Sequence, residues 1–257
     1  MRGPLIRNWL PRGLRSRLWG DREKFGLTIV ADDPCWKEWE NTQNKFYDET
    51  QRGNAGTFVN DAGYKVMRKL SLGGSTVLEI GAGDIRHDVH WNDTPDRYIL
   101  ADIRQSMNEK AEKKLVKRNI EYESIVIQRD STLPIDDSSV DMVVSFYSLE
   151  HIYPLQPYLD EVRRILKPGG KLVGAIPAEG GLAWGLGRFL TARRWFKKHT
   201  KINPDKIICW EHPNFADEIL RDLDNTFDRL SISHWPFPWL PLLDANLVIR
   251  FVYRARQ

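Results

Sequence analysis

Two Glu-His pairs, Glu150-His151 and Glu211-His212, stand out among the residues that could do chemistry. A neutral imidazole titrates near physiological pH, so either histidine could act as a general base toward a weakly acidic proton. We take His151 as the first candidate catalytic residue, with Glu150 beside it, and His212 as the second. Two alternatives stay open. The first pair could have a structural role at a helix start, and His212 could cap a helix that begins at Pro213.

Three further acids adjoin strand-like segments and suit a nucleotide ligand. Glu79 stands just before the turn Gly81-Ala82-Gly83, where an acid favours a ligand with a positive group. Asp102 ends the next strand-like segment, so its carboxylate can accept hydrogen bonds from both hydroxyls of a ribose. Asp130, within Gln128-Arg129-Asp130-Ser131, is placed to accept a hydrogen bond from an adenine amino group. Either aspartate could instead be an ordinary strand-end or loop-capping carboxylate.

The turn after Ile80 defines the type of site. The apolar run from Ser75 to Ile80 predicts a buried strand, and the small residues Gly81, Ala82 and Gly83 let the backbone come close to a ligand. A strand, a glycine turn and a helix are how α/β proteins build nucleotide sites. A dinucleotide fingerprint needs a third glycine, but that position is Arg86. This argues against an NAD-binding protein.

The rest of the chain supplies the elements that must position these residues. Alternating strand-like and helix-like segments predict an α/β fold, a Rossmann-like, doubly wound, mostly parallel seven-stranded sheet with helices on both faces. Ligands of such sheets bind at the carboxyl ends of the strands. We expect strands at 75–80, 98–103, 121–127, 140–146, 171–176, 227–233 and 247–253, helices at 58–70, 84–91, 105–118 and 155–166, and a turn at Lys167-Pro168-Gly169-Gly170.

Two segments extend this core. We expect residues 1–56 to form an N-terminal helical cap and residues 57–257 to form the main, ligand-binding domain. Within the main domain, residues 178–215 read as an insertion after the fifth strand, a lid on the substrate side. Both segments are rich in aromatic residues, so we expect them to fold together over the strand ends.

Composition narrows the class of protein. The formal net charge of +3 is too small to indicate nucleic acid by itself. Two cysteines form neither a disulfide framework nor a metal knuckle, and we expect a cytoplasmic protein. The start of the chain lacks a continuous apolar segment, so we expect no cleaved signal. The apolar stretch from Trp235 to Leu243 contains three prolines and cannot be a transmembrane helix.

Basic residues gather in two segments. Residues 1–20 contain five arginines and no acid, and residues 186–206 contain seven Lys or Arg and one acid, interleaved with Phe189, Trp195 and Phe196. One interpretation is a solvated lid with a few core tryptophans. The other is a surface for an anionic, bulky or lipid-linked acceptor, because Lys and Arg attract phosphate and Trp suits a bilayer interface. The second interpretation would place the protein peripherally at the inner face of a membrane.

His87 and His90 lie in a charged segment with Asp84, Asp88 and Asp93. Their spacing aligns them only loosely on one helix face. We therefore interpret both histidines as surface residues.

Taken in order, the motifs resemble class I S-adenosylmethionine-dependent methyltransferases of the small-molecule, type 11-like group. The resemblance covers about residues 57–177 and rests on Val77-Leu78-Glu79-Ile80-Gly81-Ala82-Gly83, Asp102, Asp130, Asp141-Met142-Val143-Val144-Ser145-Phe146, Leu149-Glu150-His151 and Leu166-Lys167-Pro168-Gly169-Gly170-Lys171-Leu172.

This resemblance implies an enzyme with S-adenosyl-L-methionine as its cofactor. The contacts that it implies are Glu79 with the amino group, Gly81, Ala82 and Gly83 along the methionine part and ribose, Asp102 with the ribose, Ile103 against the adenine, Asp130 and Ser131 at the adenine edge, and Ser145 and Tyr147 beside the methionine moiety. Some related quinone O-methyltransferases hold a metal through a Glu where this chain has Tyr147, so we expect no metal site.

The implied reaction asks little of the protein, because the cofactor already carries an activated methyl group. The enzyme must align the acceptor and, for a hydroxyl, remove a proton. We expect O-methylation of a small-molecule or glycan-like acceptor, such as a free, nucleotide-linked or lipid-linked sugar. A quinone, phenolic or lipid acceptor and a non-catalytic binding protein are the alternatives. The sequence Ser145-Phe146-Tyr147-Ser148 lacks an Asn/Asp-Pro-Pro-aromatic motif, so we expect no nucleic-acid substrate.

Overall fold

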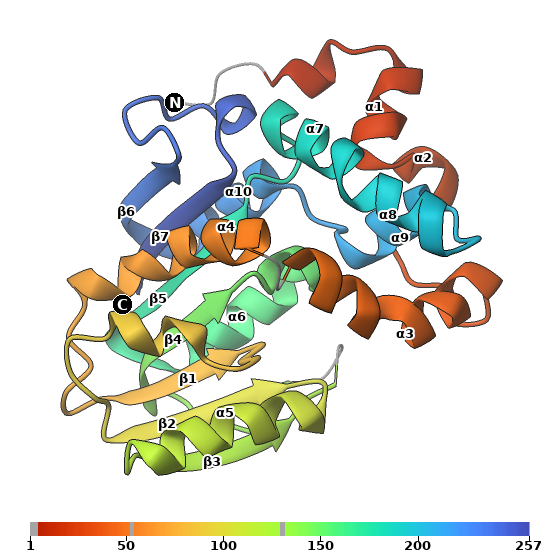
Figure 1. The fold of residues 1–257 in the computed structure, drawn as a ribbon. Helices are drawn as coiled ribbons and strands as arrows, with labels where there is room; N and C mark the ends of the chain where they lie inside the picture. Colours follow the sequence, from red (N-terminus) through yellow and green to blue (C-terminus); the bar gives the residue numbers. More distant parts are fainter. Residues whose placement is uncertain (1–4, 52–53, 129–131, 257) are drawn as a thin grey trace.

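Seven strands form one sheet in the order β3-β2-β1-β4-β5-β7-β6 (Figure 1). Neighbours from β3 to β5 pair in parallel, whereas β7 pairs antiparallel with both β5 and β6. The computed structural model describes residues 5–51, 54–128 and 132–256. Its strands are β1 (Thr76–Ile80), β2 (Arg97–Asp102), β3 (Glu121–Val126), β4 (Val140–Phe146), β5 (Leu166–Pro177), β6 (Phe227–Trp235) and β7 (Val248–Ala255). The predicted Rossmann-like, mostly parallel fold is confirmed.

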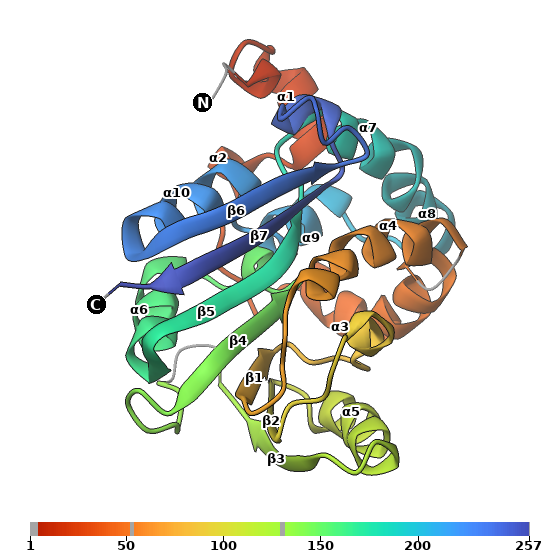
Figure 2. The same cartoon turned by 90° about the vertical axis from the view of Figure 1, so that its left-hand side faces the viewer.

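Helices cover both faces of this sheet (Figure 2). One face packs against α6 (Leu155–Ile165) and α10 (Ala216–Thr226). The other packs against α5 (Gln105–Lys117) and against α4 (Asn54–Tyr64) with the 3-10 helix η3 (Lys65–Lys69). The helix predicted over 58–70 is therefore an α-helix that tightens into a 3-10 helix after Tyr64.

Side chains alternate between two cores along the central strands. Leu78 and Ile80 of β1 belong to the core under α6 and α10, whereas Val77 belongs to the core under α5. This is the period of two that a strand imposes, and burial on both faces explains why the central strands read as continuous apolar runs. The same alternation places Glu79 on the α5 side, where its carboxylate must find polar partners.

The predicted turn at residues 167–170 lies inside a strand. β5 already pairs with β4 at Leu166, and the register then shifts so that Lys171 pairs with Met142. The residues between them bulge out of the ladder, with Gly169 at φ +77°. The glycines thus shape an irregular strand start, and helix α6 ends directly at Ile165.

The N-terminal segment and the insertion are both helical. Their helices are η1 (Ile6–Asn8), α1 (Arg12–Trp19), α2 (Arg22–Phe25), α3 (Pro34–Phe46) and η2 (Tyr47–Gln51) at the N-terminus, and α7 (Leu182–Leu190), α8 (Ala192–His199) and α9 (Pro204–Glu211) in the insertion. Figure 1 shows them side by side above the carboxyl ends of the strands.

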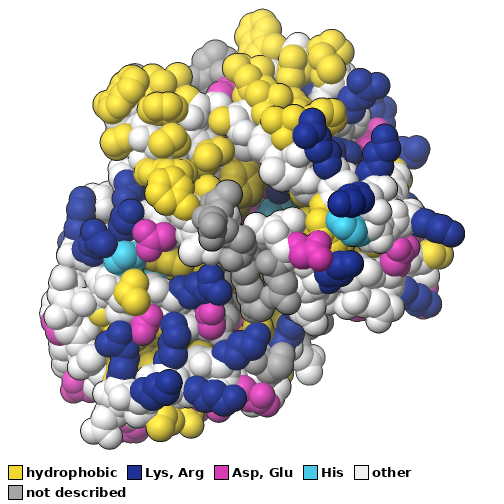
Figure 3. Space-filling model, viewed as in Figure 1, with side chains coloured by type: hydrophobic (Ala, Val, Ile, Leu, Met, Phe, Trp, Pro, Cys, Tyr) yellow, Lys and Arg dark blue, Asp and Glu magenta, His cyan; other side chains and the backbone are white. Residues whose placement is uncertain are grey.

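One aromatic cluster joins these two helical segments. The ring centroids of Trp39 in α3 and Phe196 in α8 lie 5.4 Å apart, and those of Phe46 and Trp195 lie 5.1 Å apart. Trp195, Phe196 and Trp210 are buried. These aromatic residues of the basic segment are therefore core residues. Other apolar side chains of the N-terminal segment and the insertion, on or next to η1, α1 and α7, lie at the surface (Figure 3). Among the described residues, no helix has the length and apolar character to span a bilayer.

We predict that Gly174→Ala destabilises the sheet. Gly174 pairs with Ser145 on one side and Phe251 on the other. A Cβ there would overlap the Ser145 carbonyl oxygen and lie 2.9 Å from the Phe251 ring. Overpacking of this kind costs about 1–3 kcal/mol or more in the free energy of unfolding, measured by urea denaturation.

The matched control is Gly13→Ala in helix α1, where a new Cβ meets nothing within 4 Å. This change should leave stability unchanged or raise it by up to about 1 kcal/mol. Equal effects of the two substitutions would contradict the prediction.

Candidate functional site

A cavity of about 1650 Å³ lies at the carboxyl ends of the central strands, beneath the N-terminal helices and the insertion. Pockets for one small ligand usually measure about 300–1,000 Å³, so this cavity has room for two molecules. Ten of the predicted site residues line it: Glu79, Gly81, Ala82, Gly83, Asp102, Ile103, Tyr147, Glu150, His151 and His212. Asp130 and Ser131 lie outside the described residues.

The glycine turn gives the cavity an open backbone wall. Gly81 and Gly83 adopt φ +70° and +56°, a region that residues with a Cβ rarely occupy. A Cβ at Gly81 would overlap the Ser148 hydroxyl. A Cβ at Gly83 would meet only the Gly81 carbonyl oxygen, at 3.9 Å, so this side of Gly83 faces open space. The turn therefore leaves room for a ligand to approach the main chain closely.

Asp102 presents a buried carboxylate to the same wall. Its Oδ1 accepts a hydrogen bond from the Arg104 amide at 2.9 Å. Burial raises the pKa of Asp102 above its ordinary value, although the amides of Arg104 and Gly83 partly offset this. A ligand that donates hydrogen bonds, such as a ribose, would stabilise the charged form. Ile103 next to it is exposed in the cavity, as an adenine-packing residue should be.

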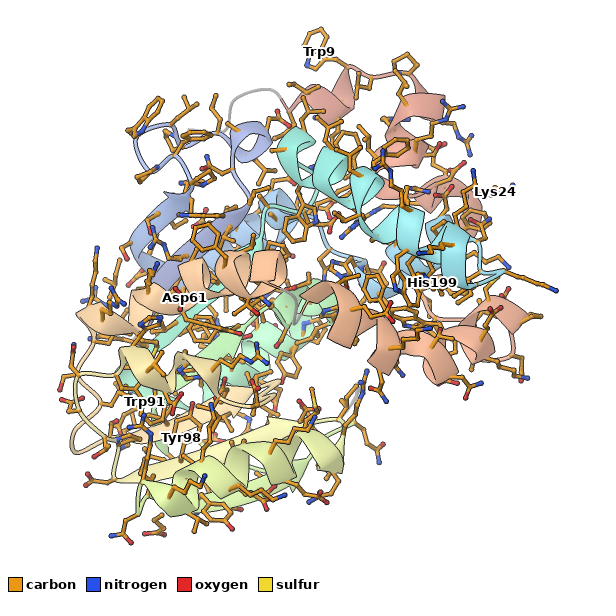
Figure 4. All side chains as sticks on the ribbon, in the orientation of Figure 1. Trp9, Lys24, Asp61, Trp91, Tyr98 and His199 are labelled. Carbon is orange, nitrogen blue, oxygen red and sulfur yellow. The ribbon has the colours of Figure 1, made fainter. Side chains whose placement is uncertain are left out.

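A buried network holds the Glu79 carboxylate. His87 Nε2 lies 2.9 Å from Glu79 Oε1, and the Tyr98 hydroxyl donates to Oε2 at 2.6 Å. Trp91 Nε1–H donates to His87 Nδ1 at 2.9 Å. Because an indole N–H can only donate, His87 Nδ1 carries no proton and Nε2–H donates to Glu79. Figure 4 shows Trp91 and Tyr98 close together, and their rings stack at 5.5 Å.

The interpretation of His87 and His90 as surface residues is wrong, since both are buried. The short helix expected over 84–91 is a 3-10 helix, η4 (Arg86–His90). His90 repeats the pattern of His87: Arg68 Nε donates to its Nδ1 at 3.1 Å, and its Nε2 lies 2.7 Å from Asp61 Oδ1. The spacing of residues within the segment does not reveal that the two histidines point inward. Their partners, Glu79 and Asp61, come from other elements.

Glu150, His151 and Glu211 form a second polar cluster that lines the cavity. The 3-10 helix η5 (Leu149–His151) after β4 carries the first two. His151 Nδ1–H donates to the Glu211 carbonyl oxygen at 2.5 Å, and its Nε2 lies 3.9 Å from Glu150 Oε1. Glu211 Oε1 accepts from Trp39 Nε1 at 2.8 Å. The imidazole is therefore oriented from one nitrogen and left available at the other.

Burial and neighbouring charges shift the protonation of this cluster. Burial raises the pKa of Glu150 to about 7, and its Oε2 has no hydrogen-bond partner among the described residues. Burial would lower the pKa of His151, but the Glu211 hydrogen bond and the Glu150 charge raise it. Burial opposes ionisation of Glu211 as well, yet its hydrogen bond with His151 lowers its pKa to about 2. Glu150 therefore changes protonation near neutral pH, whereas the pKa of His151 lies above its ordinary value.

His212 directly follows helix α9 as its C-cap, so the alternative that it caps a helix beginning at Pro213 is wrong. The next helix begins only at Ala216. His212 Nδ1 lies 3.1 Å from Glu179 Oε2, and its ring lies 4.6 Å from that of His151. Burial lowers the pKa of His212 to about 4, so the ring is neutral at physiological pH.

Glu179 and Arg188 are an ion pair that sequence reasoning missed. Arg188 Nη1 donates to Glu179 Oε1 at 2.7 Å, and Trp184 Nε1 donates to Oε2 at 2.9 Å. Burial opposes the charge on Glu179, but Arg188 and His212 hold its pKa well below the usual range. The only sequence signal was the arginine itself, within a basic segment. The pair anchors α7 to the end of β5 and lets Arg188 and Trp184 line the cavity.

Ser145 and Tyr147 differ in how they relate to the cavity. Ser145 is fully buried and is not among the described residues that line it. Tyr147 lines the cavity, but its hydroxyl donates to the carbonyl oxygens of Val59 and Asn60, at 3.3 and 3.0 Å. Its ring thus ties β4 to helix α4.

Comparison with known proteins identifies the class. Residues 78–174 match the family model described as a methyltransferase domain. The chain is 33% identical over 108 residues to a ubiquinone/menaquinone biosynthesis C-methyltransferase of Enterobacter sp. (strain 638), covering 39% of this chain and 41% of that protein. It is 32% identical over 117 residues to the demethylmenaquinone methyltransferase of Lactococcus lactis, covering 42% and 45%. The match thus spans less than half the length of these curated relatives.

Solved structures show the same fold. A carbon methyltransferase, CurJ, matches 95% of this chain and 64% of its own at a TM-score of 0.56 and 18% identity. An S-adenosylmethionine-dependent methyltransferase of Mesorhizobium loti matches 79% and 99% at a TM-score of 0.51 and 18% identity. Residues 78–174 are thus a methyltransferase domain by sequence, and the chain shares its fold with solved S-adenosylmethionine-dependent methyltransferases. Both the resemblance and the cofactor that it implies are confirmed at the level of the family.

The residues of the cavity fit S-adenosylmethionine. The open side of Gly83 and the buried Asp102 carboxylate face one part of the cavity, as a ribose requires. Glu79 lines the same part, and each of its oxygens keeps a lone pair beyond its bond to His87 or Tyr98. A cofactor ammonium group would find a preoriented acid there. The specific contacts of these residues stay predictions.

We predict that Asp102→Ala weakens binding of S-adenosylhomocysteine by about 1–3 kcal/mol, the scale of a lost hydrogen bond to a charged group. Isothermal titration calorimetry measures this directly. The matched control is Asp96→Ala, a strand-end aspartate outside the cavity whose Oδ1 accepts from the Gly74 amide. Unchanged affinity in the Asp102 variant would remove this residue from the cofactor site.

We predict that Glu150→Gln stabilises the fold at alkaline pH. The folded pKa of Glu150, about 7, lies above that of an unfolded glutamate, so its ionisation destabilises the fold progressively as pH rises from about 4.5 to 7. The variant should gain about 1–3 kcal/mol over the parent in urea unfolding at pH 8 and little at pH 4. An equal difference in unfolding free energy between variant and parent at pH 4 and pH 8 would show that ionisation of Glu150 is not its cause.

Proposed function

We propose that this protein transfers a methyl group from S-adenosylmethionine to a hydroxyl of a small-molecule acceptor, with His151 as the general base. The observation that carries the proposal is the position of His151, which lines the cavity with Nδ1 held by the Glu211 carbonyl oxygen and Nε2 3.9 Å from Glu150 Oε1. When bound, the cofactor supplies an activated methyl group on a sulfonium. The remaining tasks are orientation of the acceptor, removal of its proton and exclusion of water.

The chain divides these tasks among named residues. The turn at Gly81 and Gly83 with Asp102 would hold the nucleoside, leaving the rest of the cavity for the acceptor. His151 Nε2 would accept the acceptor proton, and the buried Glu150 would stabilise the resulting imidazolium at 3.9 Å. The Glu211 carbonyl oxygen fixes the ring orientation by accepting from Nδ1–H. The helices of the N-terminal segment and the insertion would exclude water.

The acceptor side of the cavity combines rings with hydrogen-bonding groups. We assign to it Trp184, Phe46, Tyr47 and Asn44, all of which line the cavity. This mixture suits a glycan-like or phenolic acceptor, because sugar and phenol faces pack on aromatic rings while their hydroxyls need polar partners. A free, nucleotide-linked or lipid-linked sugar is our first candidate.

A second candidate is methylation of a ring carbon in a quinol. The names of the matched relatives describe quinone biosynthesis and a C-methyltransferase. A phenolic hydroxyl deprotonated by His151 would make the neighbouring ring carbon nucleophilic, so the same base serves either outcome.

Radiolabelled methyl transfer tests the proposal. Purified protein with labelled S-adenosylmethionine is incubated with sugar, nucleotide-sugar, lipid-linked glycan and quinol pools. We expect label in one pool. A folded protein that binds S-adenosylhomocysteine but labels none of these pools would refute the proposed acceptor class, and one that binds no cofactor would refute methyl transfer.

We predict that His151→Asn lowers kcat at least about a hundredfold while cofactor affinity is kept, the usual scale of a lost general base. Asparagine can still donate from its amide toward the Glu211 carbonyl oxygen, so local structure should persist. In the parent, kcat/KM should rise with pH through the titration of the Glu150-His151 pair.

Glu150→Gln provides a second readout of the same role. Removing the negative charge lowers the pKa of His151, so the acidic limb of kcat/KM should shift to lower pH. A merely structural role of Glu150 would leave this limb in place. Full activity of His151→Asn at all pH values would assign the base elsewhere.

A further inference from the structure

An extended apolar face lies on the outer side of the helical segments. Hydrophobic side chains gather over α1, α7 and the loop between β6 and β7, at the top of the view in Figure 3. Two tryptophans protrude furthest, Trp9 at 78% exposed and Trp239 at 75%. The face consists of Ile6, Trp9, Leu14, Leu186, Phe189, Leu190, Phe237, Trp239 and Leu242, all of them exposed large hydrophobic residues.

A single carboxylate ties the three parts of this apolar face together. Asp244 Oδ2 accepts from the Ile6 amide and Oδ1 accepts from the Leu182 amide, both at 2.9 Å. Asp244 itself belongs to the 3-10 helix η6 (Leu243–Ala245), next to the loop that carries Trp239. Phe237 and Trp239 also pack together, with ring centroids 5.7 Å apart. The segments that carry the protruding side chains are therefore held together by hydrogen bonds.

Cationic side chains flank the apolar face. Arg17 of α1 and Arg194, Lys197 and Lys198 of α8 are all exposed. None of the four forms an ion pair with another described residue. Helix α8 follows α7 directly and contacts it, so the cations lie at the edge of the apolar residues of α7. Their charge is therefore available to an external anionic surface.

We propose that this apolar face with its cationic flank docks on an anionic lipid surface. Protruding tryptophans suit the boundary between headgroups and acyl chains, because the ring has an apolar body and a polar N–H. Lysine and arginine next to them attract anionic headgroups. A second copy of the chain fits less well, since pairing the face with itself would expose both cationic flanks to like charge.

Helix α7 connects the docking face with the cavity. Leu186, Phe189 and Leu190 lie on its exposed stripe, at helical spacing. Trp184 and Arg188 lie on another stripe, which lines the cavity. If the methyl transfer proposed above holds, docking brings the acceptor side of the cavity next to the bilayer, where a lipid-linked or amphipathic acceptor would be found.

Vesicle co-sedimentation tests the docking without any measurement of turnover. The parent protein should sediment with vesicles of phosphatidylglycerol and phosphatidylcholine in equal parts, and much less with phosphatidylcholine alone. The variant Trp9→Ser/Trp239→Ser should bind at least about tenfold more weakly. The variant Arg17→Glu/Lys197→Glu, which changes two flanking cations that do not line the cavity, should bind at least about thirtyfold more weakly, since each cation near the surface contributes about a factor of five.

Helix α5, at the opposite end of the molecule in Figure 1, offers matched controls. Val116→Ser removes an exposed apolar side chain there, and Lys113→Glu/Lys117→Glu reverses two exposed charges. Both controls should bind vesicles like the parent, and all variants should keep the parent affinity for S-adenosylhomocysteine. That affinity separates loss of docking from loss of the cofactor site.

Three results would overturn the proposal. The first is a folded parent that does not sediment with anionic vesicles. The second is equal weakening in the face variants and the α5 controls. The third is a dimer, seen by analytical ultracentrifugation, that dissociates in Trp9→Ser/Trp239→Ser without vesicle binding by the parent; the face would then be an interface between copies.

Discussion

The contacts of Glu211 connect the three parts of the chain that form the site. Its carboxylate accepts from Trp39 of the N-terminal helix α3, and its carbonyl oxygen accepts from His151 at the end of β4. Glu211 itself ends helix α9 of the insertion. One residue thus positions both the candidate base and the helices that cover the cavity, those of the N-terminal segment and the insertion. Replacing its side chain would leave the buried Trp39 indole N–H without this acceptor, at a cost of about 1–3 kcal/mol, while the backbone carbonyl oxygen that orients His151 would remain.

Two polar clusters with different electrostatics line the cavity. In the first, each Glu79 oxygen accepts one hydrogen bond, from His87 or Tyr98, so the carboxylate is a fixed acceptor. In the second, Glu150 has an oxygen without a partner and a pKa near 7. A satisfied acid recognises a ligand, whereas an unsatisfied one can change protonation during a reaction. This difference in hydrogen bonding, and not residue type, separates the two roles.

The helices of the N-terminal segment and the insertion have an inner side toward the cavity and an outer side toward solvent. Their inner side buries Trp39, Trp195 and Phe196 in the aromatic cluster, and α7 lines the cavity with Trp184 and Arg188. Their outer side carries the apolar face with Trp9; Figure 4 shows that residue at the outer edge of the molecule. Composition alone left two interpretations of these aromatic, basic segments. The buried aromatic residues of α3 and α8 fit the first interpretation, whereas the second stays a proposal for the exposed side chains.

The sequence by itself determined the sheet, the glycine turn and the class of cofactor, because strand periodicity and glycine turns depend on residues adjacent in the chain. It also named Glu150, His151 and His212. Only the tertiary structure decided what each residue does there. His87 and His90 are buried by partners from other elements, Ser145 lies away from the cavity wall, and Glu211 reaches the base from the insertion. Burial and pKa depend on neighbours that are distant in the chain, and no local pattern encodes them.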